Sequence, residues 1–350
     1  IYVWLDALTN YISALNFPDV EDKKYKDYWP ADVHIIGKDI LRFHAVFWPA
    51  FLLAAKLSPP KRVFGHGWIL SDEKKMSKSL GNILDPLEII NKYGIDQLRY
   101  YLVKEVSLGN DGSISMENLK NCINNDLANN YGNLCQRVFS FIKKNCENKI
   151  PKSKKLNISD KKFLNNLKNN VPKLINLMNN QELNEYIKIV VSFSFEANKY
   201  FNDLEPWAVK KKDPDRMKTI LFTIVQQIKN ISILLNPIIP NATNKVLNII
   251  NFSSKNIKID KDNLYVWRDT IDETEIHMND TYKGEALNFS SSVSTNLEEI
   301  FKIWKDIPLG DIKKLSLNTN NLIFVCHDCL NVDGFKHYPL IFLVIQSTSA

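Results

Sequence analysis

Two lysines and two serines stand together in the segment Lys75-Met76-Ser77-Lys78-Ser79. A strand-like run precedes the segment and Leu80-Gly81-Asn82 follows it, so we expect the lysines on a loop. Mobile ammonium groups there can stabilise the negative charge that builds on a leaving pyrophosphate. The residues before Lys78 lack the Gly-x-x-x-x-Gly-Lys-Ser/Thr pattern of a P-loop. The interpretation without chemistry is an exposed charged loop.

Gly37 and Asp39 follow a β-branched run, Val33 to Ile36. A glycine lets the backbone approach a nucleotide closely, and a carboxylate at the end of a strand can accept hydrogen bonds from both ribose hydroxyls. Aromatic residues are also frequent near the amino terminus, where Trp4, Phe43 and Trp48 are each core residues by default.

Short apolar runs that end at glycine, each followed by a longer amphipathic run, organise residues 1 to about 110. This pattern is typical of α/β folds, in which ligands lie at the carboxyl ends of parallel strands. The first eight residues read as a buried strand that enters a helix. No internal repeat is visible.

Longer helical patterns begin at Ser115, which is placed to cap a helix that carries Glu117 in its first turn. Apolar residues then recur at spacings of three and four up to Ile142, which predicts one long amphipathic helix. Two further helices are predicted over 183–204 and 214–235, with prolines marking their ends. Together these helices predict an α-bundle. The Lys- and Asn-rich stretch 143–162 reads as a solvated connection within it.

The composition is that of a globular protein with more than one domain: 350 residues, 45% hydrophobic and 24% charged. The longest apolar run, Ala45 to Ala55, contains Pro49 and is too short to cross a bilayer. Five scattered cysteines show no disulfide framework, which makes the cytoplasm the expected compartment. The net charge of +6 is mildly favourable for a polyanionic partner.

Four ordered segments carry a resemblance to a known family. The lysine segment resembles the second signature of class I aminoacyl-tRNA synthetases, and three other segments narrow the resemblance to methionyl-tRNA synthetases. They are Tyr2-Val3-Trp4-Leu5-Asp6-Ala7, His34-Ile35-Ile36-Gly37-Lys38-Asp39-Ile40 with Phe43-His44, and His66-Gly67-Trp68. The resemblance covers residues 1 to about 250.

The resemblance implies that methionine and ATP, with Mg²⁺, form methionyl-adenylate, and that the methionyl group then passes to tRNA(Met). It implies a catalytic role for Lys75 and Lys78, and an ATP site made of Gly37, Asp39, Lys75, Met76, Ser77, Lys78 and Ser79. The methionine pocket would be lined by Trp4, Ala7, Tyr11, Ile40, Phe43 and His44. An aromatic and aliphatic pocket of this kind suits a polarisable thioether.

A second implied site lies in the helical region. Asn133 and Arg137 lie one turn apart on one helix face, and Pro206-Trp207 follows the end of another helix. In methionyl-tRNA synthetases an Asn, an Arg and a Pro-Trp at matching places read the CAU anticodon. Splayed loop bases are stacked on aromatic side chains and hydrogen-bonded at their edges, which fits these residue types.

The sequence departs from the family in two respects. The earlier His-Ile-Gly-His type of signature is absent, so we expect this chain alone to be inactive as a fragment that lacks the amino-terminal part. The family's zinc knuckle would also lie before Ile1, and Cys326-x-x-Cys329 has no second pair, so we expect no metal site here. Residues from about 285 match nothing in the family.

We therefore expect an α/β fold: the carboxyl-terminal half of a Rossmann-like class I catalytic domain over residues 1–114, and an all-α anticodon-binding bundle over 115–252. Residues 253–350 form an extension of unknown role. The expected function is that of a methionine-tRNA ligase. Two alternatives stay open: a class I synthetase for another apolar amino acid, or a non-catalytic RNA-binding module derived from a synthetase. The sequence leaves the oligomeric state open.

Overall fold

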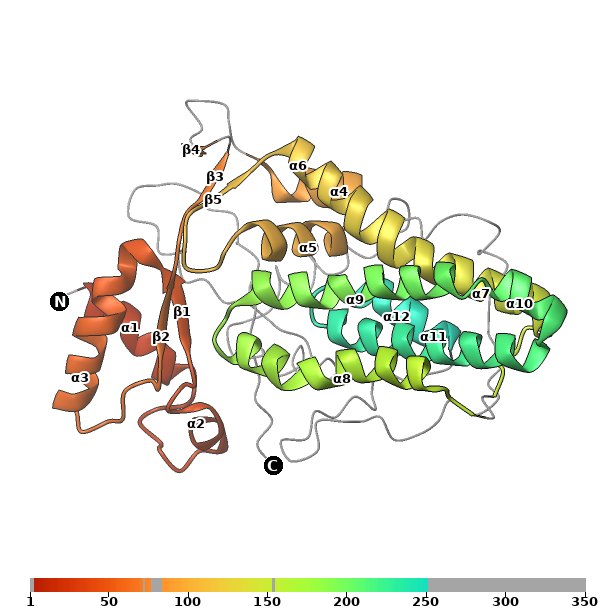
Figure 1. Ribbon diagram of the computed structural model, residues 1–350. Coiled ribbons are helices and arrows are strands. Elements are labelled where there is room, and N and C mark those ends of the chain that lie inside the picture. Colours follow the sequence, from red (N-terminus) through yellow and green to blue (C-terminus); the bar gives the residue numbers. More distant parts are fainter. Residues whose placement is uncertain (1–2, 72, 77–83, 153–154, 251–350) are drawn as a thin grey trace. The chain divides into compact units, whose positions relative to one another are not determined.

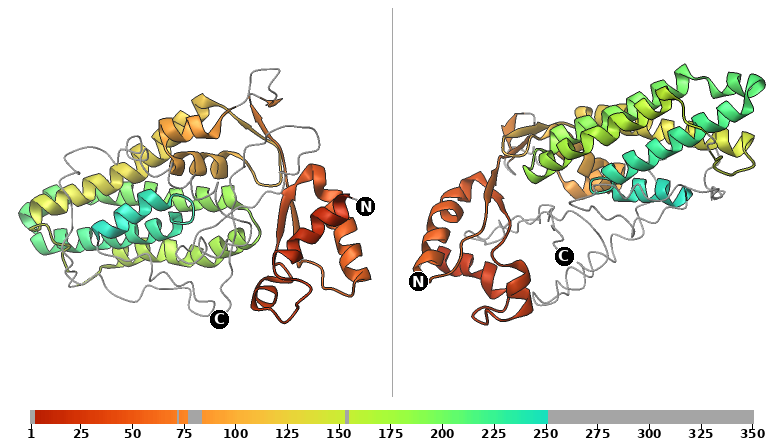
Figure 2. Two further views of the ribbon diagram at one scale, coloured as in Figure 1. Left: turned by 180° about the vertical axis from the view of Figure 1, so that it is seen from behind. Right: turned by 60° about the horizontal axis from the view of Figure 1, so that its bottom comes forward.

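The computed structural model describes residues 3–71, 73–76, 84–152 and 155–250. These residues divide into two compact units, one made of residues up to 70 with 108–112, the other of 71–107 with 113–250. Figures 1 and 2 show the strands and short helices of the first unit and the long helices of the second. No helix within the described ranges is both long enough and apolar enough to cross a membrane.

The first unit is built around two parallel strands. Strand β1 (His34–Gly37) pairs with β2 (Val63–His66), so that Gly37 lies opposite His66 at their carboxyl ends. The chain between them forms a 3₁₀ turn η1 (Lys38–Ile40), a π-helical turn η2 (Phe43–Phe47) and helix α3 (Trp48–Ala54). This is the strand-turn-helix pattern that the sequence predicts, and it confirms that part of the fold.

Helices α1 (Val3–Ser13) and α2 (Lys23–Tyr28) complete the first unit. Its core is the cluster Leu8, Ile12, Tyr25, Trp29, Trp48 and Leu52. Trp48 is therefore a core residue, as predicted. The strand expected at the start of the chain is wrong for Val3 to Leu8, because these residues are already helical. Helix suits them because Val3 and Leu5 face solvent while Leu8 reaches the core.

A small three-stranded sheet of order β4-β3-β5 follows, formed by Ile69–Ser71 (β3), Lys74–Lys75 (β4) and Gly112–Ile114 (β5). Helices α4 (Pro86–Tyr93) and α5 (Ile95–Glu105) lie between β4 and β5 in the sequence. Asp85 caps α4, since its carboxylate accepts a hydrogen bond from the N–H of Leu87 at 2.8 Å.

Within the second unit, a continuous helical run extends from Met116 to Asn145. It consists of α6 (Met116–Cys122), a π-helical segment η4 (Ile123–Gly132) and α7 (Asn133–Asn145). Ser115 caps α6 by accepting from the N–H of Asn118, as predicted. The uniform α-helix expected here is corrected by the π segment. Apolar residues at 119, 123, 127 and 131 recur every four residues, so they would drift around a helix of 3.6 residues per turn, and wider turns keep them on one side.

The remaining helices are α8 (Ile158–Asn179), α9 (Leu183–Asp203), α10 (Pro206–Lys212), α11 (Pro214–Leu235) and α12 (Pro240–Ile249). Of these, α9 and α11 pack against the run 116–145. In Figures 1 and 2, α8, α9 and α11 run alongside one another, and contacts join each pair of them. The predicted helices 183–204 and 214–235 are confirmed. The expected connection 143–162 is too long, because α7 continues to Asn145 and α8 already begins at Ile158.

Candidate functional site

Most of the predicted pocket residues come from two elements of the first unit. Trp4, Ala7 and Tyr11 recur at spacings of three and four on α1, so that they share one face of that helix. Phe43 and His44 lie on the π-helical turn η2, just after Ile40. Ile40 and His44 are buried, whereas Trp4, Ala7, Tyr11 and Phe43 are half-buried. A π-helical turn is frequently found at functional sites.

Aromatic contacts bring the two elements together. The rings of Trp4 and Phe43 stack with centroids 3.9 Å apart and an angle of 9° between their planes. Tyr11 meets His44 edge to face at 5.7 Å, and Trp4 meets it at 6.3 Å. The structure therefore places four of these six residues in one aromatic cluster, with Ile40 beside it through its carbonyl contact with His44; Ile40 and Ala7 have no ring to contribute.

One hydrogen bond fixes the polar part of this cluster. The Nδ1 atom of His44 lies 3.1 Å from the carbonyl oxygen of Ile40, which only accepts, so Nδ1 carries the hydrogen and donates it. In the neutral ring, Nε2 is then an acceptor. It lies 3.0 Å from the hydroxyl of Tyr11, which donates to it.

The carboxyl ends of the parallel strands hold the predicted nucleotide residues. Gly37 ends β1, and the exposed Asp39 follows within η1. A Cβ atom on Gly37 would lie 2.5 Å from Oδ1 of Asp39, so any side chain there would displace this carboxylate. Opposite Gly37, His66 ends β2 and is followed by Gly67.

Asp111 is tied to this strand edge. Its carboxylate accepts from Nζ of Lys38 at 2.5 and 2.7 Å and from the N–H of Trp68 at 2.8 Å. These hydrogen bonds, first the one from Lys38, lower the pKa of Asp111 below its usual range. Lys38 thus has a counter-ion at the same edge that carries Asp39.

The lysine segment is described in part. The backbone of Lys75 belongs to β4, and Met76, which follows it, is half-buried. Ser77, Lys78 and Ser79 lie outside the described residues, so the structure does not test their placement.

The predicted residues of the helical region form a second cluster. Arg137 on α7 donates from Nη2 to Oδ1 of Asn202 at 2.6 Å, and its guanidinium lies 5.3 Å from the ring centre of Phe201. The ring of Trp207, the second residue of α10, packs edge to face against the same Phe201 ring, with ring centroids 5.7 Å apart. Phe201 therefore connects Arg137 and Trp207, although they come from different helices.

Exposure distinguishes these residues. Pro206 is buried and begins α10, while 42% of the surface of Trp207 is exposed. Asn133 is half-buried, one helical turn before Arg137. A tryptophan that only plugged a helix end would be buried, whereas Trp207 is partly exposed.

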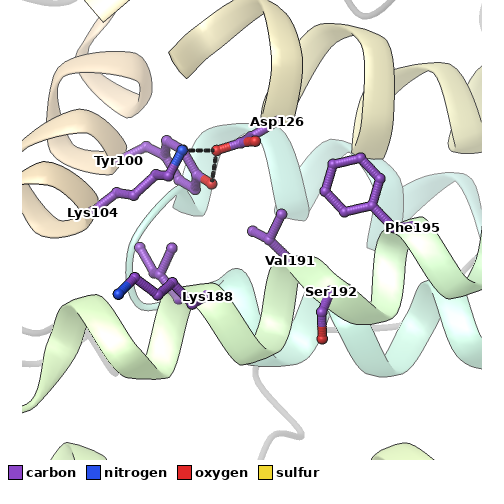
Figure 3. Close-up of a pocket in the computed structure, with 8 residues that line it drawn as sticks. Tyr100, Lys104, Asp126, Lys188, Val191, Ser192 and Phe195 are labelled. Carbon is purple, nitrogen blue, oxygen red and sulfur yellow. Dashed lines mark hydrogen bonds and ion pairs between the residues drawn. The ribbon is translucent and has the colours of Figure 1, made fainter. Parts of the chain in front are cut away.

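A separate pocket in the bundle contains none of the predicted site residues. Figure 3 shows it between α5, the π segment and α9, with Phe195 at its edge. Within it, Asp126 accepts hydrogen bonds from the hydroxyl of Tyr100 at 2.8 Å and from Lys104 at 2.5 Å. This half-buried ion pair is already satisfied, and we assign it a structural role.

Sequence reasoning missed three residues that hold these clusters together. His34 stacks on Tyr11 with ring centres 4.3 Å apart, and Phe201 and Asn202 contact Arg137. The signal for His34 was its position within the quoted segment His34 to Ile40. Phe201 belongs to the apolar stripe of α9, whose periodicity marks it as core but does not show which polar residues it touches.

Two family models match the chain. Residues 1–139 match "tRNA synthetases class I (M)", and residues 150–269 match "Anticodon binding domain of methionyl tRNA ligase". The first match, together with the strand edge and the helical unit, defines a class I tRNA synthetase fold with a Rossmann-like domain and a helical anticodon-binding domain.

Similar proteins narrow the class further. The methionine-tRNA ligase of Brucella suis is 48% identical over 250 residues, and that of Rickettsia felis is 45% identical over 251. Each alignment covers 71% of this chain, and 48% and 49% of those proteins, respectively. Mycobacterium tuberculosis methionyl-tRNA synthetase in complex with methionyl-adenylate is 38% identical with a TM-score of 0.70, covering 73% of this chain and 51% of that one.

The chain belongs to the methionyl-tRNA synthetase family. It spans about half the length of the curated relatives that it matches.

Proposed function

We propose that the protein containing this chain is a methionine-tRNA ligase. In the proposed reaction the carboxylate of methionine attacks the α-phosphorus of ATP, which forms methionyl-adenylate and releases pyrophosphate. The methionyl group then passes to the terminal ribose of tRNA(Met), and AMP leaves. No covalent intermediate with the protein is needed, so catalysis depends on positioning and on stabilisation of charge.

The single observation that carries this proposal is the aromatic cluster formed by α1 and the η2 turn that follows β1. Trp4 and Phe43 offer stacked ring faces and edges to a thioether, which makes favourable contacts with aromatic rings. Tyr11 and His44 supply a hydrogen-bonded polar group beside them. A pocket that is mostly apolar, with few placed polar groups, is typical of small-molecule sites. The relative bound to methionyl-adenylate supports the same assignment.

ATP binds, in this proposal, along the edge that carries Gly37 and Asp39. The Asp39 carboxylate accepts from the ribose hydroxyls, and the lysine segment reaches the phosphates. We assign Lys75 and Lys78 to the charge on the departing pyrophosphate, with Met76, Ser77 and Ser79 completing the loop. The described residues contain no group of three or more His, Cys, Asp or Glu side chains that would hold a metal. Mg²⁺ therefore enters the proposal as the counter-ion of the ATP phosphates.

The helical unit reads the CAU anticodon of tRNA(Met) in this proposal. Trp207 stacks on a loop base, while Arg137 and Asn133 hydrogen-bond to base edges. The two side chains that hold Arg137, Asn202 and Phe201, limit its freedom before RNA arrives, which reduces the entropy lost on binding. We keep the boundaries 1–114, 115–252 and 253–350 for the three regions and the cytoplasm as the compartment.

A titration of RNA hairpins tests the anticodon assignment on this chain. Labelled hairpins with CAU, or with one base of it changed, are titrated at two salt concentrations and followed by anisotropy. We expect a preference for CAU of more than about tenfold. Trp207→Ala should weaken CAU binding by about 1–3 kcal/mol, the value of one stacked base. Phe195→Ala, which removes another exposed aromatic ring of the same unit, is the matched control and should change little.

Equal and purely salt-dependent binding of every hairpin would contradict the anticodon assignment. That result would favour the alternative, a non-specific RNA-binding module. Loss of the preference for CAU in both Trp207→Ala and Phe195→Ala would also contradict the assignment. The loss would then not be specific to Trp207.

A further inference from the structure

A buried histidine lies behind the aromatic cluster. His34 begins β1 and is only 6% exposed. Its ring stacks on Tyr11, with centres 4.3 Å apart and 26° between the planes. It also meets the ring of Trp29 at 6.0 Å and that of His44 edge to face at 6.5 Å. His34 is thus packed among three rings: Tyr11 and His44 belong to the proposed methionine pocket, and Trp29 belongs to the core cluster.

The orientation of Tyr11 determines the hydrogen bond at the polar end of the pocket. The hydroxyl of Tyr11 donates to Nε2 of His44 at 3.0 Å, and Nδ1 of His44 donates to the carbonyl oxygen of Ile40 at 3.1 Å. If the ring of Tyr11 moved, Nε2 of His44 would lose this donor, although the bond from Nδ1 to the carbonyl oxygen of Ile40 would still keep the hydrogen on Nδ1. The polarity that the pocket presents therefore depends on what holds Tyr11.

The stacked ring of His34 provides that support, without a hydrogen bond from its Nδ1 atom. Nδ1 of His34 is buried and has no hydrogen-bond partner among the described residues. Burial, with a smaller contribution from His44, lowers the pKa of His34 to about 4, so the ring is neutral at pH 7. His34 therefore contributes an uncharged, flat ring that stacks on Tyr11. A phenyl ring would supply the same contact.

We propose that His34 is a positioning residue whose ring fixes Tyr11, so that the Tyr11 hydroxyl donates to His44 in one orientation before methionine arrives. The proposal rests on the proposed methionine pocket for its functional meaning. The stacking, the hydrogen bond and the unpartnered nitrogen carry it independently of the reaction.

Imidazole ¹⁵N NMR of this chain tests the first part, because the shift of the unprotonated Nε2 of His44 reports whether that atom accepts a hydrogen bond. In the unchanged chain we expect hydrogen on Nδ1 and the shift of an Nε2 that accepts. His34→Ala should move the Nε2 shift to that of an atom without a donor, while His34→Phe should leave it unchanged because it keeps the stacked ring. Leu52→Ala removes a side chain from the core cluster of this unit and is the control for general loosening. If His34→Ala does not fold, His34→Leu replaces it, since leucine fills space without stacking.

Three results would overturn the proposal: an unchanged Nε2 shift in His34→Ala or its Leu replacement, a moved shift in His34→Phe, or an equal movement in Leu52→Ala. The first shows that Tyr11 does not depend on His34, the second that a nitrogen atom matters, and the third that any core defect has the same effect.

Kinetics of the full-length protein test the functional part. Positioning of a binding wall should affect the ground state and the transition state alike, so His34→Ala should raise KM for methionine about tenfold with kcat little changed. KM for ATP should stay unchanged, and His34→Phe should restore KM for methionine. A fall in kcat with unchanged KM would contradict the inference. If the full-length protein does not activate methionine at all, the proposed function fails, and the NMR result still decides whether His34 holds Tyr11.

Discussion

Gly65 and Gly67, two glycines at the strand edge, differ in the space that is available for a Cβ atom. A Cβ atom on Gly67 would lie 2.2 Å from the carbonyl carbon and oxygen of Asn110 and 2.5 Å from the nitrogen of Asp111, all of them backbone atoms. On Gly65 the nearest atom would be Cδ1 of Leu41 at 3.4 Å, the far end of a flexible side chain. The segment His66-Gly67-Trp68 is therefore constrained by packing as well as by chemistry.

We predict that Gly67→Ala destabilises the first unit by about 1–3 kcal/mol, the usual cost of an overpacked site whose neighbours cannot move. Urea unfolding followed by tryptophan fluorescence measures it. Gly65→Ala is the matched control and should cost less, because the side chain of Leu41 can give way. Equal losses of stability in the two variants would show that the close approach of residues 110–111 is not the cause.

Two buried aspartates, Asp160 and Asp96, each connect two helices of the second unit. Their pKa values are shifted in opposite directions. Asp160 on α8 is fully buried and binds Arg216 of α11 through both oxygens at 2.5 and 2.9 Å. Asp96 on α5 accepts from the N–H of Ala242, at the start of α12, at 2.7 Å. Both side chains tie one helix to another, but only Asp160 has a direct ion pair.

The pH dependence of Asp160 follows from its partners. Burial raises its pKa, but the hydrogen bonds from Arg216, Tyr200 and the N–H of Asn157 together outweigh burial, so the pKa is lowered below 3.8. A lowered folded pKa stabilises the protein above the unfolded value, and this stability is lost as the pH falls through the folded value. We predict that Asp160→Asn costs about 3 kcal/mol at pH 7, because it leaves Arg216 without its charged partner.

Urea midpoints between pH 2 and 7 check this prediction. The loss caused by Asp160→Asn should shrink toward the acid end, where Asp160 is protonated in both states. Glu185→Gln breaks an exposed pair with Lys188 and serves as the control; it should change stability by less than about 1 kcal/mol. A loss for Asp160→Asn that is as small as that of the control would contradict the interpretation.

Asp96 is predicted to show the opposite slope. Burial raises its pKa to about 6, although the N–H of Ala242 and the charges of Arg99 and Lys245 lower it. A raised folded pKa gives stability that is complete below the unfolded value and is lost as the pH rises through the folded value. We expect Asp96→Asn to gain about 2 kcal/mol relative to the unchanged chain between pH 4.5 and 7.5.

The same urea midpoints at those two pH values measure the Asp96 effect. Glu88→Gln changes an exposed carboxylate of α4 and should show no such gain. A difference between Asp96→Asn and the unchanged chain that does not vary with pH would mean that Asp96 is ionised in the folded state throughout this range.

Periodicity predicted the helices whose apolar stripe is wide and whose ends carry proline or a capping serine. It missed α8, whose apolar stripe is interrupted by lysines and asparagines and which contains Pro172. That helix gains its stability from tertiary contacts and from the capping box of Asn157 and Asp160, which local propensity does not report. The π segments were missed because residue spacing was compared only with 3.6 residues per turn.

The site could be predicted as a set of residues, but not as a set of contacts. Motif resemblance found Trp4, Phe43, Tyr11 and His44, which the structure brings together. It did not find His34, because stacking between β1 and α1 depends on how the two elements pack. The placement of Lys78 stays a prediction, since it lies outside the described residues.

At the scale of the molecule, one chain carries two separate clusters. The first unit holds the aromatic cluster of α1 and η2, and the second holds an exposed tryptophan linked to an arginine through Phe201. The proposed function gives each cluster one task, the first to bind the amino acid and the second to read the anticodon. The two family matches, over 1–139 and 150–269, divide the chain at another place, because Arg137 lies in the first match and Trp207 in the second.

Aminoacylation by the full-length protein tests the central claim most directly. Transcripts of one tRNA with a CAU anticodon and with a changed anticodon are supplied with ATP and with methionine, leucine, isoleucine or valine. We predict charging of the CAU transcript with methionine, lost on omission of ATP, and kcat/KM lower by at least about tenfold for the changed anticodon or another amino acid. Charging with leucine, isoleucine or valine as efficiently as with methionine, or no charging at all, would contradict the account.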